Sequence, residues 1–147
     1  MPSRIPMKTH DDAEAVTDLL GVLWRRVHHE TMQRLTAPGI TPARMRALRF
    51  VARSEKPVRM GGLAERLGIV PRSATTLVDE LSEAGWVRRF TDPDDRRATL
   101  VEVTQEGQKM LEQANRVRRT VAAEMLSGLS GDELGKLRKL LSAAVDV

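Results

Sequence analysis

The densest group of charged side chains is the segment DPDDRR at residues 92–97, where three carboxylates precede two arginines. An arginine at a loop tip can enter the minor groove of DNA, where the negative potential favours a cation. Holding so long a side chain costs about 2 kcal/mol of rotamer entropy, and a nearby carboxylate can offset that cost through a charge-assisted hydrogen bond. We therefore expect Asp95 to orient Arg97, and Arg96 to reach a phosphate or to share the groove. The alternative is a surface salt bridge worth about 0 to 1 kcal/mol that only stabilises the turn.

A second set of polar side chains lies on a predicted helix over residues 71–84. Apolar residues recur there at the i, i+3, i+4, i+7 spacing of one helical face. An α-helix fits the major groove of DNA, where arginine can pair with guanine and a threonine methyl group can contact thymine. The alternative is that these are ordinary solvated helix positions. The polar residues of the first two turns, with the proline that starts the helix, are Pro71, Arg72, Ser73, Thr75 and Thr76.

Further helices and a hairpin must position these two groups. Thr41 and Thr104 are suitable N-caps, and Ser130 with Glu133 three residues later has the spacing of a capping box. Two β-rich segments on either side of the charged turn predict a hairpin. The expected order is α-α-α-α-β-β-α-α, which is a helix-turn-helix with a wing, flanked by long helices. The predicted helices cover 11–35, 42–53, a short segment ending at Gly68, 71–84, 104–126 and a last segment capped at Ser130, and the strands cover 86–90 and 98–103.

The charge balance permits a polyanionic partner without requiring one. The chain of 147 residues carries 24 Lys and Arg against 20 Asp and Glu, a formal net charge of +4. Basic and acidic residues are nearly equal in number between residues 53 and 97. A nucleic-acid surface must therefore come from the arrangement of the charges rather than from their total.

Several types of site are excluded by composition. The chain has no cysteine, so disulfides, thiolate metal sites and thiol-based redox sensing are not available to it. No apolar run approaches the roughly 18 to 20 residues that a membrane-spanning helix needs, and the first ten residues lack the apolar core of a signal peptide. We therefore expect a cytoplasmic protein with no membrane partner.

Five stretches of the sequence together resemble the MarR family of bacterial transcriptional regulators. The resemblance is close over residues 41–111, and the flanking helices match in length and order. Its most specific part is the charged turn followed by a strand and the pattern T-x-E-G. The matching stretches are GLAERLG (62–68), ATTLVDEL (74–81), GWVRR (85–89), DPDDRR (92–97) and LVEVTQEG (100–107).

The resemblance implies a mainly α fold with a small β-hairpin wing, in a single domain over residues 1–147. Residues 41–103 would form the winged helix-turn-helix lobe that binds DNA, and the helices in 11–40 and 104–147 would form a dimerisation layer. It also implies a homodimer that binds a pseudopalindromic operator in double-stranded DNA, usually as a repressor. The helix over 71–84 would be the recognition helix, and Arg97 would match the wing arginine that enters the minor groove.

Two residues depart from the family pattern. The position before the recognition helix is usually a serine or a similar cap, but here it is Val70. The first amides of that helix therefore lack a side-chain acceptor. Thr76 stands where the family often has an arginine, which leaves the operator sequence open.

The terminal helices carry leucine-rich stripes that a second copy of the chain could bury. A dimer would place two recognition helices near one turn of DNA apart, about 34 to 36 Å. The alternative is that both stripes pack into the core of their own chain.

An effector site is a further expectation, because the resemblance implies that small aromatic acids or phenols bind between the dimerisation layer and the DNA-binding lobe. The alternative is that the same side chains belong to the core or to an interface. We expect no cofactor and no metal site, since the adjacent residues His28, His29 and Glu30 point to different sides of a helix. The residues expected to line the effector site are Trp24, His28, Met32, Met45, Leu48 and Arg49.

An enzymatic function is not expected. The sequence contains no HExxH, GxSxG, P-loop or GxGxxG motif. The competing interpretation comes from another class, namely a winged-helix module that binds other proteins and has lost specific DNA binding. Val70, the moderate net charge and the acidic residues near the wing favour that alternative.

Overall fold

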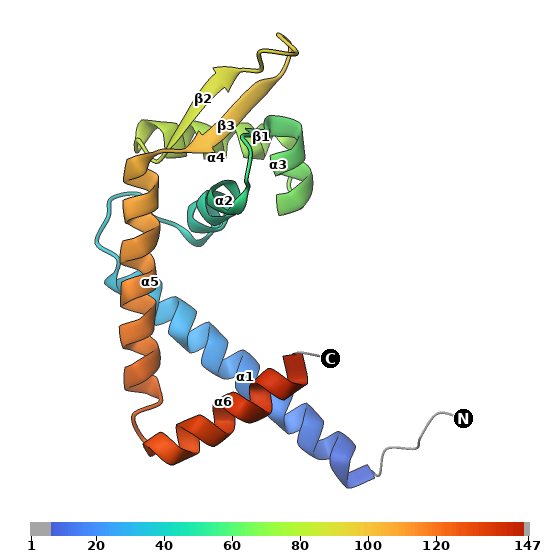
Figure 1. Cartoon of the computed structure of the whole chain (residues 1–147), viewed down its shortest axis with the longest axis vertical. Helices are drawn as coiled ribbons and strands as arrows, with labels where there is room; N and C mark the ends of the chain where they lie inside the picture. Colours follow the sequence, from blue (N-terminus) through green and yellow to red (C-terminus); the bar gives the residue numbers. More distant parts are fainter. Residues whose placement is uncertain (1–6, 146–147) are drawn as a thin grey trace. The chain divides into compact units, whose positions relative to one another are not determined.

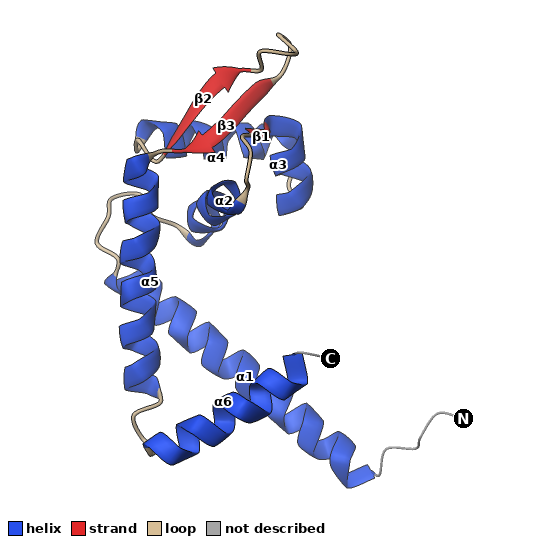
Figure 2. Cartoon of the chain, in the orientation of Figure 1, coloured by secondary structure: helices blue, strands red, loops and turns tan. Residues whose placement is uncertain are grey.

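The computed structural model describes residues 7–145, which form six helices and three short strands (Figures 1 and 2). The order contains one strand more than predicted, a two-residue strand between the second and third helices. The elements are α1 (Met7–Arg34), α2 (Pro42–Arg53), β1 (Val58–Arg59), α3 (Met60–Leu67), α4 (Pro71–Glu83), β2 (Val87–Thr91), β3 (Thr99–Val103), α5 (Gln105–Met125) and α6 (Gly131–Val145).

The predicted caps begin three of the helices. The hydroxyl of Thr41 accepts a hydrogen bond of 3.2 Å from the backbone N–H of Arg44 at the start of α2. Ser130 and Glu133 form the predicted capping box, in which the Glu133 carboxylate accepts from the Ser130 backbone N–H at 2.8 Å. That hydrogen bond, together with one from the Ser130 hydroxyl, lowers the pKa of Glu133. Thr104 caps α5 by accepting from the N–H of Gly107 at 3.1 Å.

The chain separates into two compact units. One contains α1, the part of α5 from Val117 onward, and α6, and the other runs from Leu35 to Arg116. These units meet at residues 34/35 and 116/117, whereas the expected dimerisation and DNA-binding parts meet at 40/41 and 103/104, and that functional division stays a prediction. α5 is shared between the units. A helix that continues without a break gives no sequence signal at the point where its packing partners change, so this boundary could not be predicted from the sequence.

The unit from Leu35 to Arg116 is built on a small antiparallel sheet with the order β1-β3-β2. In the register, Val58 pairs with Val101 and Val87 pairs with Val103. α4 packs against α3, α2 and β2, and α2 also packs against β3. The hairpin of β2 and β3 extends away from these helices and ends in the charged turn (Figure 2). The core of this unit contains Met45, Leu48, Leu63, Val78, Leu81 and Val101, none of which is more than 1% exposed.

The base of the hairpin is fastened to α5 by a close backbone junction. The carbonyl of Trp86 accepts a hydrogen bond of 3.0 Å from the N–H of Thr104. The Thr104 hydroxyl donates to the carbonyl of Gly85 at 2.5 Å. A Cβ atom on Gly107 would overlap the carbonyl oxygen of Trp86, so this position of the T-x-E-G pattern has room only for glycine.

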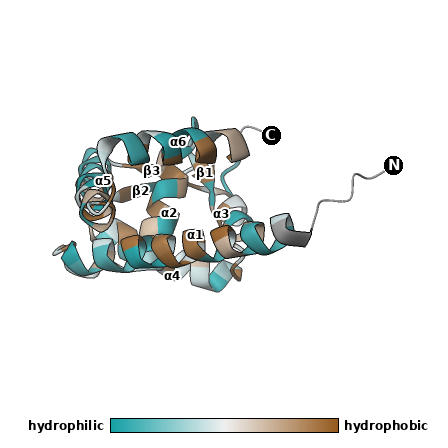
Figure 3. Ribbon diagram, turned by 90° about the horizontal axis from the view of Figure 1, so that it is seen from below, coloured by the Kyte–Doolittle hydropathy of each residue, from teal (hydrophilic) through white to brown (hydrophobic). Residues whose placement is uncertain are grey.

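The unit formed by α1, α6 and the end of α5 leaves much apolar surface uncovered. No residue of α6 is buried, and hydrophobic residues recur along both α1 and α6 (Figure 3). An ion pair joins α1 to α5 where Arg34 contacts Glu124 at 2.7 Å, and Arg34 also pairs with Glu30. These partners raise the pKa of Arg34, and the hydrogen bond from Arg34 lowers the pKa of Glu124. The exposed large apolar residues of this unit are Val16, Leu19, Leu20, Val22, Trp24, Leu129, Leu140 and Val145.

Candidate nucleic-acid interface

α4 presents a polar, exposed first half. Three of its apolar residues, Ala74, Val78 and Leu81, are fully buried, which turns the opposite side of the helix to solvent. Pro71 occupies the first turn, and Val70 makes no side-chain capping bond, as expected from the sequence. The residues predicted to contact DNA, Pro71, Arg72, Ser73, Thr75 and Thr76, are all exposed.

The two threonines of α4 hold their hydroxyl hydrogens against their own helix. Thr75 Oγ1 donates to the carbonyl of Pro71 at 3.1 Å, and Thr76 Oγ1 donates to that of Arg72 at 3.2 Å. Each oxygen keeps its capacity to accept, and each methyl group remains available for apolar contact. Such a surface is suited to the thymine methyl group and to amino-group donors on the base edges.

Two carboxylates of α4 are neutralised by arginines of the same unit. Asp79 pairs with Arg89 of β2, and Glu80 accepts from Nε of Arg44 of α2 at 2.8 Å. The hydrogen bond from Arg44 lowers the pKa of Glu80, so this side chain is ionised and paired at neutral pH. The acidic part of the helix therefore does not repel a polyanion as strongly as its sequence suggests.

The wing turn is organised around Asp92, whose side chain is almost fully buried. Its carboxylate accepts from the backbone N–H of Asp94 at 2.9 Å and pairs with Arg59 Nη2 at 2.6 Å. Asp95 lies 3.7 Å from the same guanidinium. The backbone hydrogen bond from Asp94, followed by the Arg59 contact, lowers the pKa of Asp92. Asp92 therefore stays charged and joins the turn to the start of α3.

The predicted side-chain bond between Asp95 and Arg97 does not form in the structure. The carboxylate of Asp95 accepts instead from the backbone N–H of Arg97, at 3.1 Å. The reason is competition, because the guanidinium of Arg59 lies within ion-pair distance of both carboxylates. Sequence reasoning missed Arg59, which lies 33 positions before its partner Asp92, and no local pattern indicates so distant a pair.

The other arginines of the wing and the recognition helix are left available. Within residues 7–145, the side chains of Arg72, Arg96 and Arg97 take part in no ion pair, and all three residues are exposed. Arg97 also lines a cavity of about 330 Å³ together with Arg59 and the first residues of α3. Each of the two elements expected to contact DNA thus carries cationic groups that can meet a polyanion.

The residues expected to line an effector site fall in different units. The rings of Trp24 and His28 stack with their centroids 6.1 Å apart, and Met32 on the same helix is half-buried. Met45 and Leu48 belong to the buried core of the other unit. Arg49, also in that other unit, lines a cavity of about 220 Å³ with residues of α2 and of the first half of α5.

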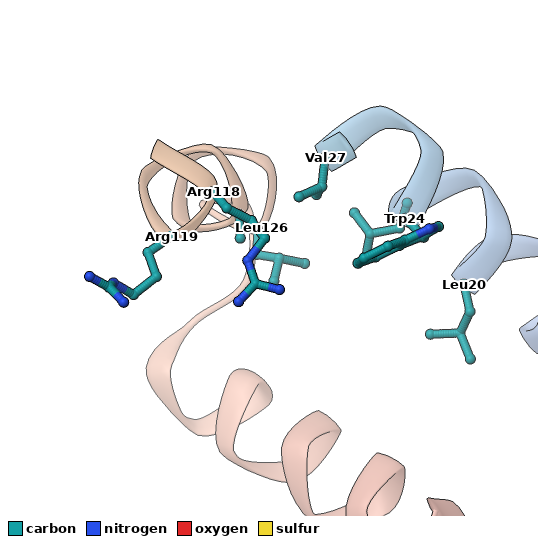
Figure 4. A pocket seen from close by; sticks show the side chains of 8 residues that line it. Leu20, Trp24, Val27, Arg118, Arg119 and Leu126 are labelled. Carbon is teal, nitrogen blue, oxygen red and sulfur yellow. The ribbon is translucent and has the colours of Figure 1, made fainter. Parts of the chain in front are cut away.

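Trp24 borders a second, more apolar cavity of about 560 Å³. Figure 4 shows the side chains of Leu20, Trp24 and Val27 coming from α1 and those of Arg118 and Arg119 from α5. Sequence reasoning did not include the residues of α5, since nothing in the sequence places them beside Trp24. An apolar wall with two arginines at its edge can accept a flat ring that carries a negative charge.

Comparison with known proteins shows which proteins this chain is similar to. The sequence model of the MarR family matches residues 39–98. The HTH-type transcriptional repressor MdtR of Bacillus subtilis (strain 168) is 27% identical over 132 residues, which cover 87% of this chain and 83% of MdtR. Similarity to a protein named a transcriptional repressor agrees with the expectation that this chain is not an enzyme.

Solved structures have the same fold. The transcriptional regulator Tm0710 from Thermotoga maritima is 28% identical, with a TM-score of 0.78 over 90% of this chain and 93% of Tm0710. A mutant of MarR from E. coli is 24% identical, with a TM-score of 0.73 over 96% of this chain and 97% of the MarR chain. The predicted winged helix-turn-helix with flanking helices is therefore confirmed. Among residues 7–145, no helix is long and apolar enough to cross a membrane.

Proposed function

We propose that this chain, whose residues 39–98 match the model of the MarR family, is a regulator of that family that binds double-stranded DNA at a pseudopalindromic operator, as a homodimer, and represses transcription. Its place of action would then be the bacterial cytoplasm, where the chromosome lies. The relative MdtR is named a transcriptional repressor, which favours repression over activation.

The observation that carries this proposal is the charge arrangement of the unit from Leu35 to Arg116. Two of the acidic side chains of α4 are paired with arginines of the protein, whereas Arg72, Arg96 and Arg97 are exposed without an ion pair in the described chain. Arg72 and the two threonines would read bases in the major groove. The wing arginines would contact the phosphates and the minor groove.

Binding to DNA is tested by selection from random duplexes, followed by titration of the selected duplex and of a scrambled duplex of equal length. We expect the selected duplex to carry two inverted half-sites and to bind at least about 1,000-fold more tightly than the scrambled one. Equal affinity for both duplexes would favour the competing function, a winged-helix module for protein partners.

The homodimer is supported by the apolar surface of α1 and α6. Leu19, Leu140 and Val145 are each at least 68% exposed, and a large exposed apolar surface marks an interaction site. A two-fold dimer buries the same patch on both copies. It would also present two recognition helices to two half-sites of one operator.

Release by a small aromatic acid is a second proposal, favoured by the cavity beside Trp24. Its apolar side chains would enclose the ring, and Arg118 or Arg119 would pair with the carboxylate. A ligand that binds better to the form unable to bind DNA would lower operator occupancy by its difference in affinity.

Benzoate, as a simple aromatic acid, provides the probe for this site. The chain has two tryptophans, and Trp24 is 57% exposed whereas Trp86 is 9% exposed. Benzoate should change the tryptophan emission of the native chain, and the change should disappear in Trp24→Phe. An unchanged emission, or a change that persists in Trp24→Phe, would remove the cavity from the mechanism.

A further inference from the structure

Arg44 holds together two segments that are distant in the chain. Its guanidinium donates through Nη1 to the carbonyl of Gly39, in the loop that leads from α1 to α2. Nε donates to Glu80 on α4 at 2.8 Å. The Arg44 side chain is only 22% exposed, which is low for an arginine in a lobe of this size.

Local structure directs Arg44 toward both partners. Thr41 caps α2 at the backbone N–H of Arg44 itself, which fixes the turn that carries the side chain. Gly39 has a φ of 73°, a left-handed conformation suited to glycine, and a Cβ atom there would strike Arg44 Nη1. The loop conformation and the position of the guanidinium therefore depend on each other.

The same contact reaches the helix expected to read DNA. Glu80 lies four residues after Thr76, one helical turn along α4. A second carboxylate of the helix, that of Asp79, is held by Arg89 from the sheet. Removing the Arg44 contact would leave α4 fastened by charge on one side only, so that its exact orientation would depend on the packing of its buried face and on the Arg89 contact.

We propose that Arg44 is a positioning residue for DNA recognition, which sets the orientation of α4 by tying it to the loop at Gly39. The proposal rests on the DNA-binding function proposed above. Arg44 does not contact DNA in this mechanism. Its loss lowers the preference for the operator over other DNA, and the phosphate contacts of the wing remain.

Arg44→Gln tests the proposal, with Arg46→Gln as the matched control. Arg46 lies on the same helix, is exposed, and forms no ion pair within the described residues, so both variants lose one positive charge. We expect Arg44→Gln to reduce the ratio of operator to scrambled-duplex affinity by about tenfold, the effect of losing a coupled contact. Arg46→Gln should leave the ratio unchanged, and the salt slope should be the same in both variants.

Gly39→Ala tests the loop side of the same contact. Gly68→Ala is its control, because Gly68 also has a positive φ, 64°, but a Cβ atom there meets nothing within 4 Å. Gly39→Ala should reduce the affinity ratio as Arg44→Gln does, and it should add little in the double variant, since both remove one contact. Gly68→Ala should be additive with Arg44→Gln.

Three outcomes would overturn the proposal. One is an affinity ratio for Arg44→Gln equal to that of Arg46→Gln. Another is a proportional loss of operator and scrambled-duplex affinity together with a lower Tm, which would indicate a merely structural role. The third is full additivity of Gly39→Ala with Arg44→Gln. Failure of the native chain to prefer any duplex is a different result, because it removes the proposed function itself.

Discussion

At the scale of single residues, Arg97 carries the most direct prediction for DNA binding. Arg97→Ala should weaken operator binding and reduce the slope of log K against log salt by about one, because one phosphate or groove contact releases about one counterion. Arg88→Ala is the matched control, since Arg88 lies on the same hairpin but is already paired with Glu102. The measurement is a titration at several salt concentrations. An Arg97→Ala slope equal to that of Arg88→Ala would remove the wing arginine from the contact.

Asp92 gives a prediction about acid stability. Its pKa is lowered from an ordinary value of 3.8 by the backbone N–H of Asp94 and by Arg59. A lowered folded-state pKa stabilises the fold above the unfolded-state value, and this stabilisation is lost as the pH falls through the folded-state value. Asp92→Asn should therefore unfold at lower denaturant concentration than the native chain at pH 7, and the two should converge below about pH 3.8.

The control for this experiment is Asp94→Asn, in the same turn. The carboxylate of Asp94 is exposed and accepts no hydrogen bond in the described chain. It should leave the denaturation midpoint at pH 7 unchanged. A gap between Asp92→Asn and the native chain that stays constant from pH 7 to pH 3 would contradict the charged role of Asp92.

The residue scale also marks the limit of sequence reasoning. The polar positions of α4 followed from the helical period, because burial of Ala74 and Val78 determines which side faces solvent. The partner of the wing carboxylates did not follow from the sequence, because it is the pairing of β1 with β3 that places Arg59 beside them. A side-chain contact made through a sheet register has no counterpart in local spacing.

At the scale of elements, the uncapped start of α4 predicts a stabilising substitution. Val70 is 64% exposed and has φ −68° and ψ 149°, the extended conformation of an N-cap residue. Val70→Ser should raise the free energy of unfolding by about 1 kcal/mol relative to Val70→Ala, since its hydroxyl can accept from the first turn. Urea unfolding of the two variants measures the difference. Equal midpoints would mean that these amides are already satisfied by solvent.

The helices were predictable because their apolar spacing and caps agree. α2, α4 and α5 begin within a residue of the predicted positions, and Thr41, Thr104 and Ser130 act as expected. α1 begins at Met7, four residues before the predicted start. This first turn was not predicted because its residues show no apolar period. β1 was missed, since a strand of two residues shows no alternation and exists through its pairing with β3.

At the scale of the whole molecule, the prediction concerns assembly. Leu140 is 70% exposed, so Leu140→Glu should leave the fold of the single chain intact while placing a charge in the proposed dimer interface. We expect sedimentation to show a shift toward monomer, and operator affinity to fall because the two half-sites are then bound separately. Leu140→Gln should have a smaller effect on both quantities. An unchanged sedimentation coefficient would place the interface elsewhere.

The division into two units was the part of the architecture least accessible from sequence. The order of elements and the wing follow from motifs within about 70 residues, whereas the boundary inside α5 at Val117 depends on which segments pack together. Similarly, the expected effector residues were chosen from two helices by spacing alone, and they lie in different units. Helical period shows which side of a helix is apolar, but it does not identify the partner.

The junction between Trp86, Thr104 and Gly107 has a consequence for local opening of the protein. Since the Thr104 amide is bonded to the Trp86 carbonyl and Gly107 lies directly against that carbonyl, the foot of the hairpin cannot separate from α5 without exposing the Thr104 amide proton to water. Deuterium should therefore enter the amide of Thr104 more slowly than the amides at the hairpin tip. The hairpin would fray from its outer end while its attachment to α5 stays closed.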